Sequence, residues 1–395
     1  MQVPKLRFKE FTNEWNLNKL KDFSNRVTRK NKDNLSKLPL TISAQDGLVD
    51  QISFFNKTVA SKDLSGYYLL YNGDFAYNKS YSNGYPWGTI KRLDKYDMGV
   101  LSTLYICFKP NSTINSNFLV QLFNSTVWYS GISEIAVEGA RNHGLLNISV
   151  SDFFETIYKI PSLEEQTKIA NFLSLIDRKI ELQEKLVENL KLYKKGLLQK
   201  VFSNNHGWNI IKFSSIIKKG KAGGTPTSNN KQYYNGNIPF LSITDITSQG
   251  KYIYTTEKNI SELGLNSSST WIVPQNSLIY SMYASVGIPT INKIPLATSQ
   301  AMFNIILNEN ENLEYIYYYL LYFHDNGLSK LIETGTQGNI NAQYVLNLNI
   351  LYPSIEEQTQ IANLFSNLDK KIDFETNRLT NLKEYKKGLL QQMFI

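Results

Sequence analysis

The chain of 395 residues has one cysteine, three histidines and no long apolar run. A lone cysteine, Cys107, cannot form an internal disulfide, which fits a protein of the reducing cytoplasm. No stretch approaches the ~18 consecutive apolar residues that a membrane-spanning helix needs. No apolar segment follows Met1, so we also expect no signal peptide. These absences predict a cytoplasmic protein with no membrane partner.

The sequence also lacks the common signatures of catalysis. The glycine-rich stretch 220–224 is not closed by Gly-Lys-Ser/Thr, so it is not a P-loop, and no dinucleotide fingerprint GxGxxG is found. The histidines have no metal-ligand spacing with the cysteine; they are His143, His206 and His324. There is no Asn/Asp-Pro-Pro-aromatic tetrapeptide of the kind that amino-methyltransferases use, and no GxSxG. We therefore predict no catalytic residue, no metal and no cofactor in this chain.

Charge is a weaker guide. Lys and Arg outnumber Asp and Glu by 42 to 34, which gives a net charge of +8. An excess of this size is compatible with a polyanionic partner such as DNA, but it also serves general solubility. Charge alone therefore does not decide between the two.

The most informative feature is an internal repeat. Residues 161–171 read PSLEEQTKIAN and residues 353–363 read PSIEEQTQIAN, at an offset of 192 residues. The match continues without a gap to 202 and 394, with 24 of 42 positions identical. A repeat of this length predicts two variable domains, each followed by a near-constant helix. The predicted parts are domain 1–160, helix 161–202, domain 203–352 and helix 353–395.

Each repeated helix carries a start signal. Ser162 and Glu165 have the spacing of a capping box, and so do Ser354 and Glu357. A proline precedes each serine, which prevents the helix from extending backward. The sequence therefore predicts that both helices begin at these serines.

The motif Tyr-Lys-Lys-Gly comes late in both copies, at 193–196 and 385–388. Lysine beside glycine is typical of a helix C-terminus, so we predict that the helices end there. The doubled lysine could contact phosphate or a partner, or it could be a solvated last turn.

Along both helices, seam positions recur in alternating steps of four and three residues, a heptad pattern. The predicted coiled-coil positions are Ile169, Leu173, Ile176, Ile180, Gln183, Val187, Leu190, Ile361, Phe365, Leu368, Ile372, Glu375, Leu379 and Leu382. A two-fold relation between the copies requires the helices to pair antiparallel. Gln183 and Glu375 would then lie near the middle and fix the register. The alternative is that both face solvent, because the seam drifts on a straight helix.

Between the helices, short β-branched and aromatic runs are separated by Gly, Asn, Ser and Pro. The predicted strands include 67–71, 103–108, 240–244, 277–280 and 303–307, and the predicted short helices are 117–130 and 313–323. The predicted fold class is α+β, with two mostly-β domains separated by an antiparallel coiled coil of two long helices and related by a pseudo-two-fold repeat.

Polar, basic and glycine-rich loops carry the candidate binding chemistry. They are 78–84 with 91–92, 138–144, 218–228 and 333–341. Arg, Asn, Gln, Ser and Thr pair with base edges and phosphates, and glycine lets backbone come close to a ligand. Each loop could also be an ordinary surface turn. The predicted DNA-binding residues are Lys79, Ser80, Tyr81, Ser82, Lys91, Arg92, Arg141, Asn142, His143, Lys219, Lys221, Thr225, Thr227, Ser281, Tyr283, Gln337, Asn339 and Asn341.

Taken together, these motifs resemble the specificity (S) subunits of type I restriction–modification systems. The resemblance rests on the doubled Pro-x-x-Glu-Glu-Gln helix, the Tyr-Lys-Lys-Gly-Leu-Leu-Gln tails, Trp15, and Gly224-Thr-Pro-Thr with Ile238-Pro-Phe. It implies two target-recognition domains that each read one half of a split, asymmetric double-stranded DNA sequence. It also implies a non-catalytic subunit that binds two methyltransferase (M) subunits, which use S-adenosylmethionine, and is joined by restriction (R) subunits.

Two other functions stay open on the sequence. The chain could be a stand-alone DNA methyltransferase or nuclease with an unrecognised site, and turnover by the purified chain would favour that. It could instead be a two-headed scaffold that binds proteins, and salt-insensitive binding would favour that.

Overall fold

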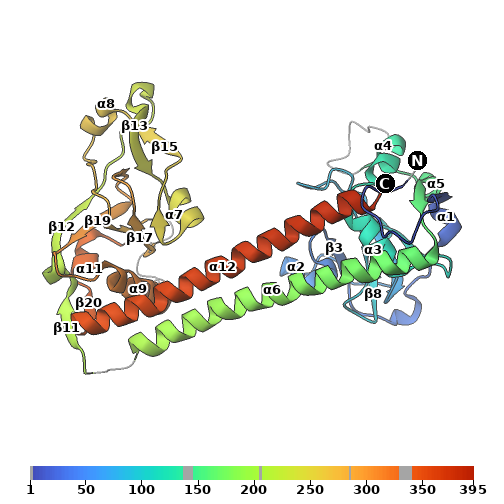
Figure 1. Ribbon diagram of the computed structural model, residues 1–395, viewed down its shortest axis with the longest axis horizontal. Helices are drawn as coiled ribbons and strands as arrows, with labels where there is room; N and C mark the ends of the chain where they lie inside the picture. The colour runs from blue at the N-terminus through green and yellow to red at the C-terminus, as the bar shows by residue number, and fades with distance from the viewer. Residues whose placement is uncertain (1–2, 137–145, 204–206, 284–285, 329–339) are drawn as a thin grey trace. The chain divides into compact units, whose positions relative to one another are not determined.

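The computed structural model describes residues 3–136, 146–203, 207–283, 286–328 and 340–395. The chain divides into two compact units. Unit 1 comprises Met1–Glu184 with Asn377–Ile395, and unit 2 comprises Lys185–Thr376. Each unit contains a β-rich part, the start of one long helix and the end of the other (Figure 1). The two boundaries, after 184 and after 376, are separated by the repeat offset of 192 residues.

Unit 1 is built on short strands. Its helices are α1 (Leu20–Phe23), α2 (Gln51–Phe55), α3 (Ser116–Asn124), α4 (Tyr129–Ile135) and α5 (Val150–Glu155). Its strands are β1 (Asn16–Lys19), β2 (Ser24–Arg26), β3 (Leu40–Ser43), β4 (Gly47–Asp50), β5 (Tyr68–Tyr71), β6 (Phe75–Asn78), β7 (Thr89–Arg92), β8 (Met98–Leu101), β9 (Ile106–Pro110) and β10 (Ile157–Ile160). The strands form a sheet of order β2-β9-β6-β7 and the pairs β1-β10, β3-β4 and β5-β8.

Unit 2 is similar in kind. Its helices are α7 (Ile243–Gln249), α8 (Glu262–Asn266), α9 (Leu313–Phe323) and α11 (Ala342–Leu346). Its strands are β11 (Asn209–Lys212), β12 (Ile217–Ala222), β13 (Tyr234–Leu241), β14 (Tyr252–Ile253), β15 (Lys258–Ile260), β16 (Leu278–Ser281), β17 (Pro289–Asn292), β18 (Ala297–Thr298), β19 (Met302–Leu307) and β20 (Asn349–Tyr352). They form sheets of order β12-β19-β16-β17-β14 and β15-β13-β18, and the pair β11-β20.

The two units share one plan although their sequences have diverged. The sheet β2-β9-β6-β7 corresponds in order to β12-β19-β16-β17. In both sets of four strands, neighbouring strands are antiparallel. The pair β1-β10 corresponds to β11-β20, and each pair ends just before a repeated helix. The predicted α+β fold class, with mostly-β parts and two long helices, is confirmed.

The repeated helices are α6 (Leu163–Ser203) and α12 (Ile355–Met393). Both continue through the Tyr-Lys-Lys-Gly motif, so the prediction that they end there is wrong. The reason is packing, because apolar side chains that follow each glycine are buried. In unit 2, Leu198 and Phe202 enter the core cluster, and in unit 1 Leu390 and Met393 do the same. Burial of these side chains offsets the ~1 kcal/mol that glycine costs inside a helix.

Only one of the two predicted capping boxes forms. At α12, Ser354 N donates to Glu357 Oε2 at 3.1 Å, and Glu357 N donates to Ser354 Oγ at 3.3 Å. At α6, Glu165 N still donates to the Ser162 hydroxyl, but the Glu165 carboxylate accepts two bonds from Arg7, each 2.7 Å long. A bidentate guanidinium is a stronger donor than a neutral backbone amide, so the N-terminal segment captures this glutamate.

The predicted seam residues are all buried or half-buried along α6 and α12. Gln183 and Glu375 are 7% and 9% exposed. The alternative that both polar side chains face solvent is therefore wrong. Their placement near the middle of a helix pair stays a prediction.

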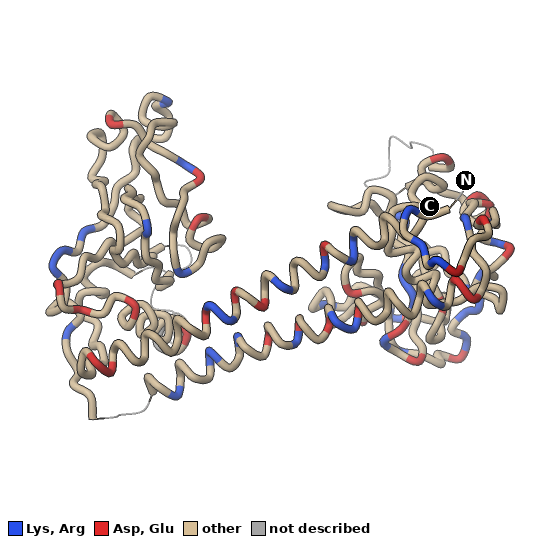
Figure 2. The backbone as a smooth tube through the Cα atoms, in the orientation of Figure 1, with Lys and Arg blue, Asp and Glu red and all other residues tan. Residues whose placement is uncertain are grey.

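Within each unit the two helices run antiparallel. In unit 1, Lys386 of α12 forms an ion pair with Asp177 of α6, and Lys383 pairs with Glu184 at 2.7 Å. In unit 2, Lys194 of α6 pairs with Asp369 of α12 at 2.5 Å. Asp177 and Asp369 are equivalent in the repeat, and so are Lys194 and Lys386. Figure 2 shows the charges of both signs that line the helices.

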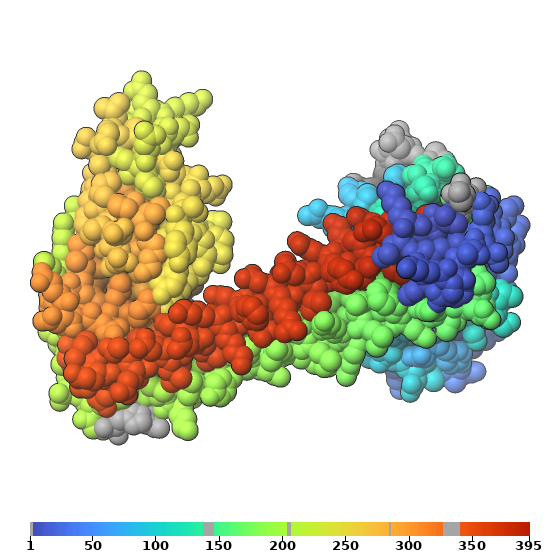
Figure 3. Space-filling view, in the orientation of Figure 1, coloured from blue at the N-terminus to red at the C-terminus, as the bar shows by residue number. Residues whose placement is uncertain are grey.

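The end of the chain closes the core of unit 1. Phe394 lies against Trp15, with ring centroids 6.3 Å apart, and Leu6 N donates to Gln392 O at 2.9 Å. In Figure 3 the red end of the chain meets the blue N-terminal residues. Trp15 is 3% exposed and packs in the core of unit 1.

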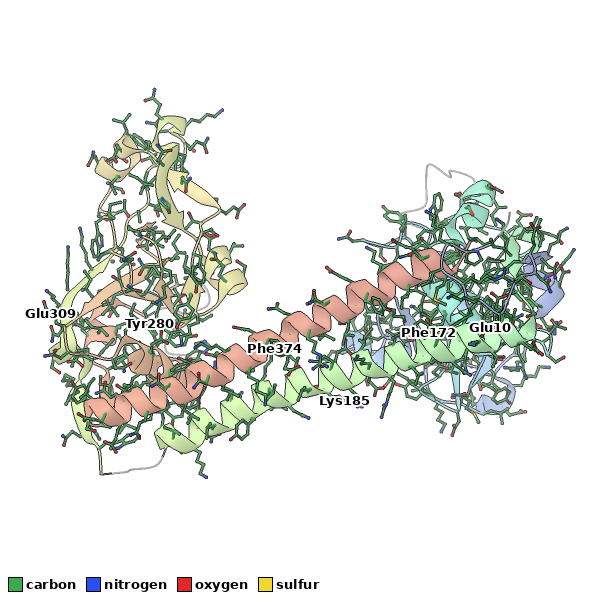
Figure 4. The ribbon with its side chains drawn as sticks, in the orientation of Figure 1. Glu10, Phe172, Lys185, Tyr280, Glu309 and Phe374 are labelled. Carbon is green, nitrogen blue, oxygen red and sulfur yellow. The ribbon has the colours of Figure 1, made fainter. Side chains whose placement is uncertain are left out.

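Unit 2 has an aromatic core. Phe202 of α6 stacks on Phe365 of α12 at 6.2 Å and also contacts Tyr315 of α9 at 5.8 Å. Tyr280 of β16, labelled in Figure 4, is fully buried in the same cluster. The long helices thus complete the core of each unit.

Two predicted elements differ in detail. The strand predicted over 240–244 ends at Leu241, because Ser242 and Asp245 form a capping box that starts α7. The helix predicted over 117–130 is two helices, because the hydroxyl of Ser125 bonds to the backbone and ends α3. In both cases a local side-chain bond to the backbone competes with the regular structure.

Phe365 and Phe374 provide a matched test of the packing on α12. Phe365 is fully buried and Phe374 is 65% exposed. We expect Phe365→Ala to lower the free energy of unfolding by about 3–5 kcal/mol, because it leaves a cavity in the core of unit 2. Phe374→Ala should change it by less than about 0.5 kcal/mol. Urea unfolding of both variants checks this, and equal losses would contradict the described packing.

Candidate nucleic-acid interface

In unit 1, two of the predicted binding loops are joined at their edges. Lys79 follows directly after β6, and its carbonyl accepts a hydrogen bond from Leu146 N at 2.9 Å. The Lys79 ammonium also reaches Ile148 O at 3.5 Å. Leu146 comes directly after residues 137–145, which lie outside the described residues. The fold therefore brings the loop after β6 to the edge of the loop before α5.

Unit 2 repeats this construction. Met282 follows directly after β16, the strand that corresponds to β6, and its carbonyl accepts from Ile340 N at 3.2 Å. Ile340 comes directly before α11 and directly after residues 329–339, which lie outside the described residues. Tyr283, beside this contact, is 41% exposed. Two units of unlike sequence thus share the same main-chain contact after equivalent strands.

The loop after β6 offers exposed polar and aromatic groups. Tyr81 is 60% exposed and Ser82 is exposed, while Lys79 and Ser80 are half-buried. Ser80 N donates to the Asn78 side chain at 3.0 Å, which shapes the start of the loop. An exposed tyrosine beside a lysine and two serines can stack on a base or bind phosphate.

A second basic surface lies on β12. Lys219 and Lys221 alternate along this strand, so both point to one face, and both are exposed. The Lys219 ammonium lies 4.1 Å from the centroid of the Trp271 ring. This contact holds one cation at a fixed place, a suitable arrangement for a phosphate contact.

The Gly-Thr-Pro loop follows β12. A Cβ added to Gly223 would lie 2.1 Å from Thr298 O, and one added to Gly224 would lie 2.4 Å from Ser269 Oγ. These glycines therefore allow close approach to the protein's own chain, not to a ligand. Thr225 and Thr227 are exposed, and the Thr225 hydroxyl bonds to Gln300.

Three predicted binding residues have side chains that are engaged inside the protein. Arg92 bonds to Asp94 at 2.6 Å and also to two residues of α3. Ser281 is fully buried, and its hydroxyl accepts from Ile288 N at 2.9 Å. Lys91 donates to Asn124 Oδ1 at 2.9 Å. The sequence did not predict these internal hydrogen bonds, because the identity of a polar residue in a strand does not show whether its side chain faces solvent or the protein.

Lys91 is an unusual lysine. Its pKa is lowered to about 8, mainly by burial and also by the nearby Lys386, while Asp177 opposes the shift. Its ammonium therefore lies close to the charged residues of the helices, within unit 1. It belongs to the support of the β-rich part and not to its loops.

Several predicted residues cannot be placed. Arg141, Asn142, His143, Gln337 and Asn339 lie outside the described residues. Asn341 is described, and its side chain caps α11 by accepting from Tyr344 N at 2.8 Å. The first described residues after the two undescribed segments are Leu146 and Ile340, which donate to the carbonyls of Lys79 and Met282.

In the described part of the chain, no group of three or more His, Cys, Asp or Glu side chains could hold a metal ion. Cys107 is buried, and burial raises its pKa to about 12. His324 pairs with its neighbour Asp325 at 2.9 Å. Among the helices described, none has an apolar stretch long enough to cross a membrane.

A cavity of about 440 Å³ lies in unit 2 beside the long helices. Its lining includes Lys194, Lys251, Tyr252, Tyr317 and Asp369. These side chains lie where the β-rich part of unit 2 contacts α6 and α12. The predicted binding loops are other segments of the sequence. The cavity is therefore a feature of the support.

Comparison with known proteins finds a family model that matches part of the chain. Residues 205–384 match the family model described as type I restriction modification DNA specificity domain. The "Type I restriction enzyme MjaIX specificity subunit" of Methanocaldococcus jannaschii is 29% identical over 194 residues. That alignment covers 48% of this chain and 44% of the relative, so the chain spans less than half the length of that relative.

Solved structures show the same fold over the whole chain. One, from work on the complex assembly and conformational transition of the type I R-M system, has a TM-score of 0.63 at 18% identity and covers 98% of both chains. Another, a type-I restriction-modification system S subunit from M. genitalium, has a TM-score of 0.56 at 16% identity. It covers 100% of this chain and 99% of that one. At these identities the likeness concerns the fold alone.

The pKa of Lys91 leads to a test of its position. Its folded-state pKa is near 8, whereas in the unfolded chain a lysine titrates near 10.5. Between these values the unfolded state binds more protons, so the unfolding free energy of the wild type should rise with pH relative to Lys91→Met. We expect a rise of about 3 kcal/mol between pH 8 and 10.5. Urea unfolding at several pH values measures it.

Lys109→Met provides the control, because Lys109 is exposed on β9, a strand of the same sheet. Its difference from the wild type should be independent of pH over the same range. A flat difference for Lys91→Met would contradict the buried position of this lysine.

Proposed function

We propose that the whole chain is the specificity subunit of a type I restriction–modification system, because residues 205–384 match the model of the DNA specificity domain of such systems. In this function each β-rich part reads one half of a split, asymmetric DNA sequence. The observation that supports it best is the duplicated construction of the loops. The contact of Lys79 O with Leu146 N in unit 1 has its counterpart between Met282 O and Ile340 N in unit 2.

The chemistry of the exposed groups fits double-stranded DNA. Lys219 and Lys221 on β12 would contact phosphates, which supply affinity without sequence preference. The loops around Tyr81 and Tyr283 would contact base edges, which supply the choice of sequence. Because these loops differ between the units, the two half-sites should differ too. The bases between the half-sites would be untouched and therefore unspecified.

We assign the parts of the chain on this basis. Residues 1–160 and 203–352 are the target-recognition domains, and residues 161–202 and 353–395 are the spacer helices. The subunit itself is non-catalytic and acts in the cytoplasm. Methylation and cleavage belong to its partners, two methyltransferase (M) subunits that bind S-adenosylmethionine and, in the full complex, restriction (R) subunits.

The repeat supports binding of the same partner twice. Where identical residues of the two copies are buried, packing explains why they are the same. Several identical residues are exposed in both copies, among them Lys191/Lys383, Tyr193/Tyr385 and Lys195/Lys387. Tyr193 and Tyr385 are 61% and 55% exposed. Two large exposed side chains at equivalent places, one in each unit, suit two copies of one partner.

The glycines of the same motif support this further. Gly196 and Gly388 lie inside helices, and a Cβ added at either would have nothing within 4 Å. The fold of this chain therefore requires neither glycine, although each costs about 0.5–1 kcal/mol of helix stability. Close approach of a partner's backbone beside Tyr193 and Tyr385 explains why both positions lack a side chain.

Adenine methylation of genomic DNA tests the function directly. Genomes mapped with and without this gene, in cells that contain the methyltransferase subunit, should differ at one bipartite sequence with two unlike half-sites. Loss of the gene should remove methylation at that sequence only. Methylation that persists without the gene, or a continuous target sequence, would contradict the proposal.

A chimera locates the recognition. With residues 20–150 replaced by the corresponding part of a related subunit, only one half-site should change, and the gap should stay the same. The purified chain alone serves as the control, because it should neither methylate nor cleave DNA. Turnover by the chain alone would favour the alternative of a stand-alone enzyme.

The partner surface has its own test. We expect the double variant Gly196→Leu/Gly388→Leu to gain about 0.5–1 kcal/mol of unfolding free energy, because the helices lose their glycines and the new side chains meet open space. Its affinity for methyltransferase subunits should fall by about tenfold or more, since the side chains obstruct the approach. Calorimetry of the full chain with these subunits measures the affinity.

Glu188→Leu is the control for this surface. Glu188 is exposed on α6, and its counterpart in the repeat is Thr380, so the position carries no identity. This variant should bind as the wild type does. Unchanged binding by the glycine variant would show that the repeated motif is not the docking surface.

A further inference from the structure

One aspartate in unit 1 joins three elements. Asp177 of α6 accepts from Gln121 of α3 through Oδ2 at 2.8 Å, and its Oδ1 pairs with Lys386 of α12. Gln121 is 2% exposed, and the Lys386 side chain is 15% exposed. Asp177 therefore links the helix that starts in this unit, the helix that ends in it, and the recognition domain.

The repeat-equivalent aspartate does the same in unit 2. Asp369 of α12 accepts from the Tyr318 hydroxyl of α9 through Oδ2 at 2.6 Å, and its Oδ1 pairs with Lys194 of α6 at 2.5 Å. Tyr318 is fully buried, and the Lys194 side chain is 17% exposed. The three linked elements are again the starting helix, the ending helix and the recognition domain.

The domain helices also occupy equivalent positions. Gln121 and Tyr318 each lie six residues after an N-cap asparagine, Asn115 for α3 and Asn312 for α9. In both units the Nδ2 of that asparagine donates at 3.2 Å to a threonine of the starting helix, Thr167 or Thr359. Besides the shared apolar core, each domain therefore has two hydrogen bonds to its long helix at equivalent positions, ten residues apart along α6 and α12. The hydrogen bond to the aspartate comes from Gln121 in unit 1 and from Tyr318 in unit 2. The contact is therefore the same in both units although the donor residue differs.

Each aspartate also lies near two lysines. In unit 1 the electrostatic neighbours of Lys91 are Lys386, which opposes its charge, and Asp177, which supports it. In unit 2 the neighbours of Lys251 include Lys194 and Asp369 with the same signs. One lysine of each set belongs to a long helix and the other to the domain. The carboxylate therefore holds together two cations that repel each other.

We propose that Asp177 and Asp369 are positioning residues that fix the direction of each recognition domain on the helices, and thereby set the gap between half-sites that the protein accepts. The inference rests on the proposed function. Without the carboxylate, the helix lysine and the domain lysine repel, and one of the two equivalent hydrogen bonds that orient the domain on the shared core is weakened. The domain would then reach half-sites at more than one spacing, while its reading loops stay unchanged.

The two positions differ in one respect that sharpens the test. In unit 2, Lys251 also forms an ion pair with Glu314, so a second carboxylate remains when Asp369 is neutralised. Among the ion pairs described in unit 1, Lys91 has no such second partner. Asp177→Asn should therefore have a larger effect than Asp369→Asn.

The experiment uses the full chain assembled with its methyltransferase subunits. The substrates are DNA duplexes with the wild-type half-sites and a gap that is native, one base pair shorter or one base pair longer. We expect the preference for the native gap to fall about tenfold in Asp177→Asn, the effect of one lost charge-assisted hydrogen bond. Asp369→Asn should lose less, and the half-site sequences of both variants should stay those of the wild type.

A second substitution separates positioning from general damage. Lys91→Met removes the domain lysine, so the double variant Asp177→Asn/Lys91→Met lacks the repulsion and should recover the preference for the native gap. Glu188→Gln and Glu384→Gln neutralise exposed carboxylates on α6 and α12 and serve as controls with the wild-type preference. If Asp177→Asn does not fold, the double variant should still fold and keep a narrow gap preference.

The inference is overturned if folded Asp177→Asn keeps the wild-type gap preference, or if Lys91→Met does not restore a preference that Asp177→Asn has lost. Failure of the proposed function has a different signature, since the wild-type complex would then show no gap preference at all or would methylate single half-sites.

Discussion

The fold depends on the pairing of two long helices, neither of which can bury its apolar stripe alone. α6 and α12 run antiparallel in each unit, and a carboxylate of the starting helix pairs with an ammonium of the ending helix, Asp177 with Lys386 and Asp369 with Lys194. Both lysine side chains are at most 17% exposed, so each needs its partner to remain charged at low cost. The same helices complete the domain cores, with Phe394 against Trp15 in unit 1 and Phe365 against Phe202 in unit 2. The stability of the domains therefore depends on the pairing of the helices.

The sequences of the two domains differ at positions where main-chain hydrogen bonds, or side chains of different types, maintain the same structure. The sheets keep their order, and the loops after β6 and β16 are held by main-chain hydrogen bonds that any side chain permits. Gln121 and Tyr318 reach equivalent aspartates with different chemistry. Such a frame allows the exposed loop residues to change without a change in their supports, as the proposed reading of two different half-sites requires.

The sequence predicted much of the architecture and little of the site. Heptad spacing and the doubled serine caps located α6 and α12, and periodicity alone located α9, because these signals are local. The positions of Glu165, Lys91 and Ser281 depended on distant partners: Arg7 draws Glu165 out of its capping box, and α3 and the helices enclose Lys91. Ser281 is hidden because β16 is an inner strand of its sheet. Glycines were also ambiguous, since Gly223 serves internal packing while Gly196 meets open space.

The distribution of identity along the helices shows where function constrains them. None of the eight positions 181–188 matches its counterpart in 373–380, whereas 10 of the 11 positions 189–199 match theirs in 381–391. A spacer needs only length and an apolar seam in its middle, and many sequences satisfy that requirement. The later segment keeps exposed residues and a helix-weakening glycine in both copies, which packing within this chain does not require. In the proposed function this constraint comes from outside the chain, and two copies of one partner would impose it twice in the same form.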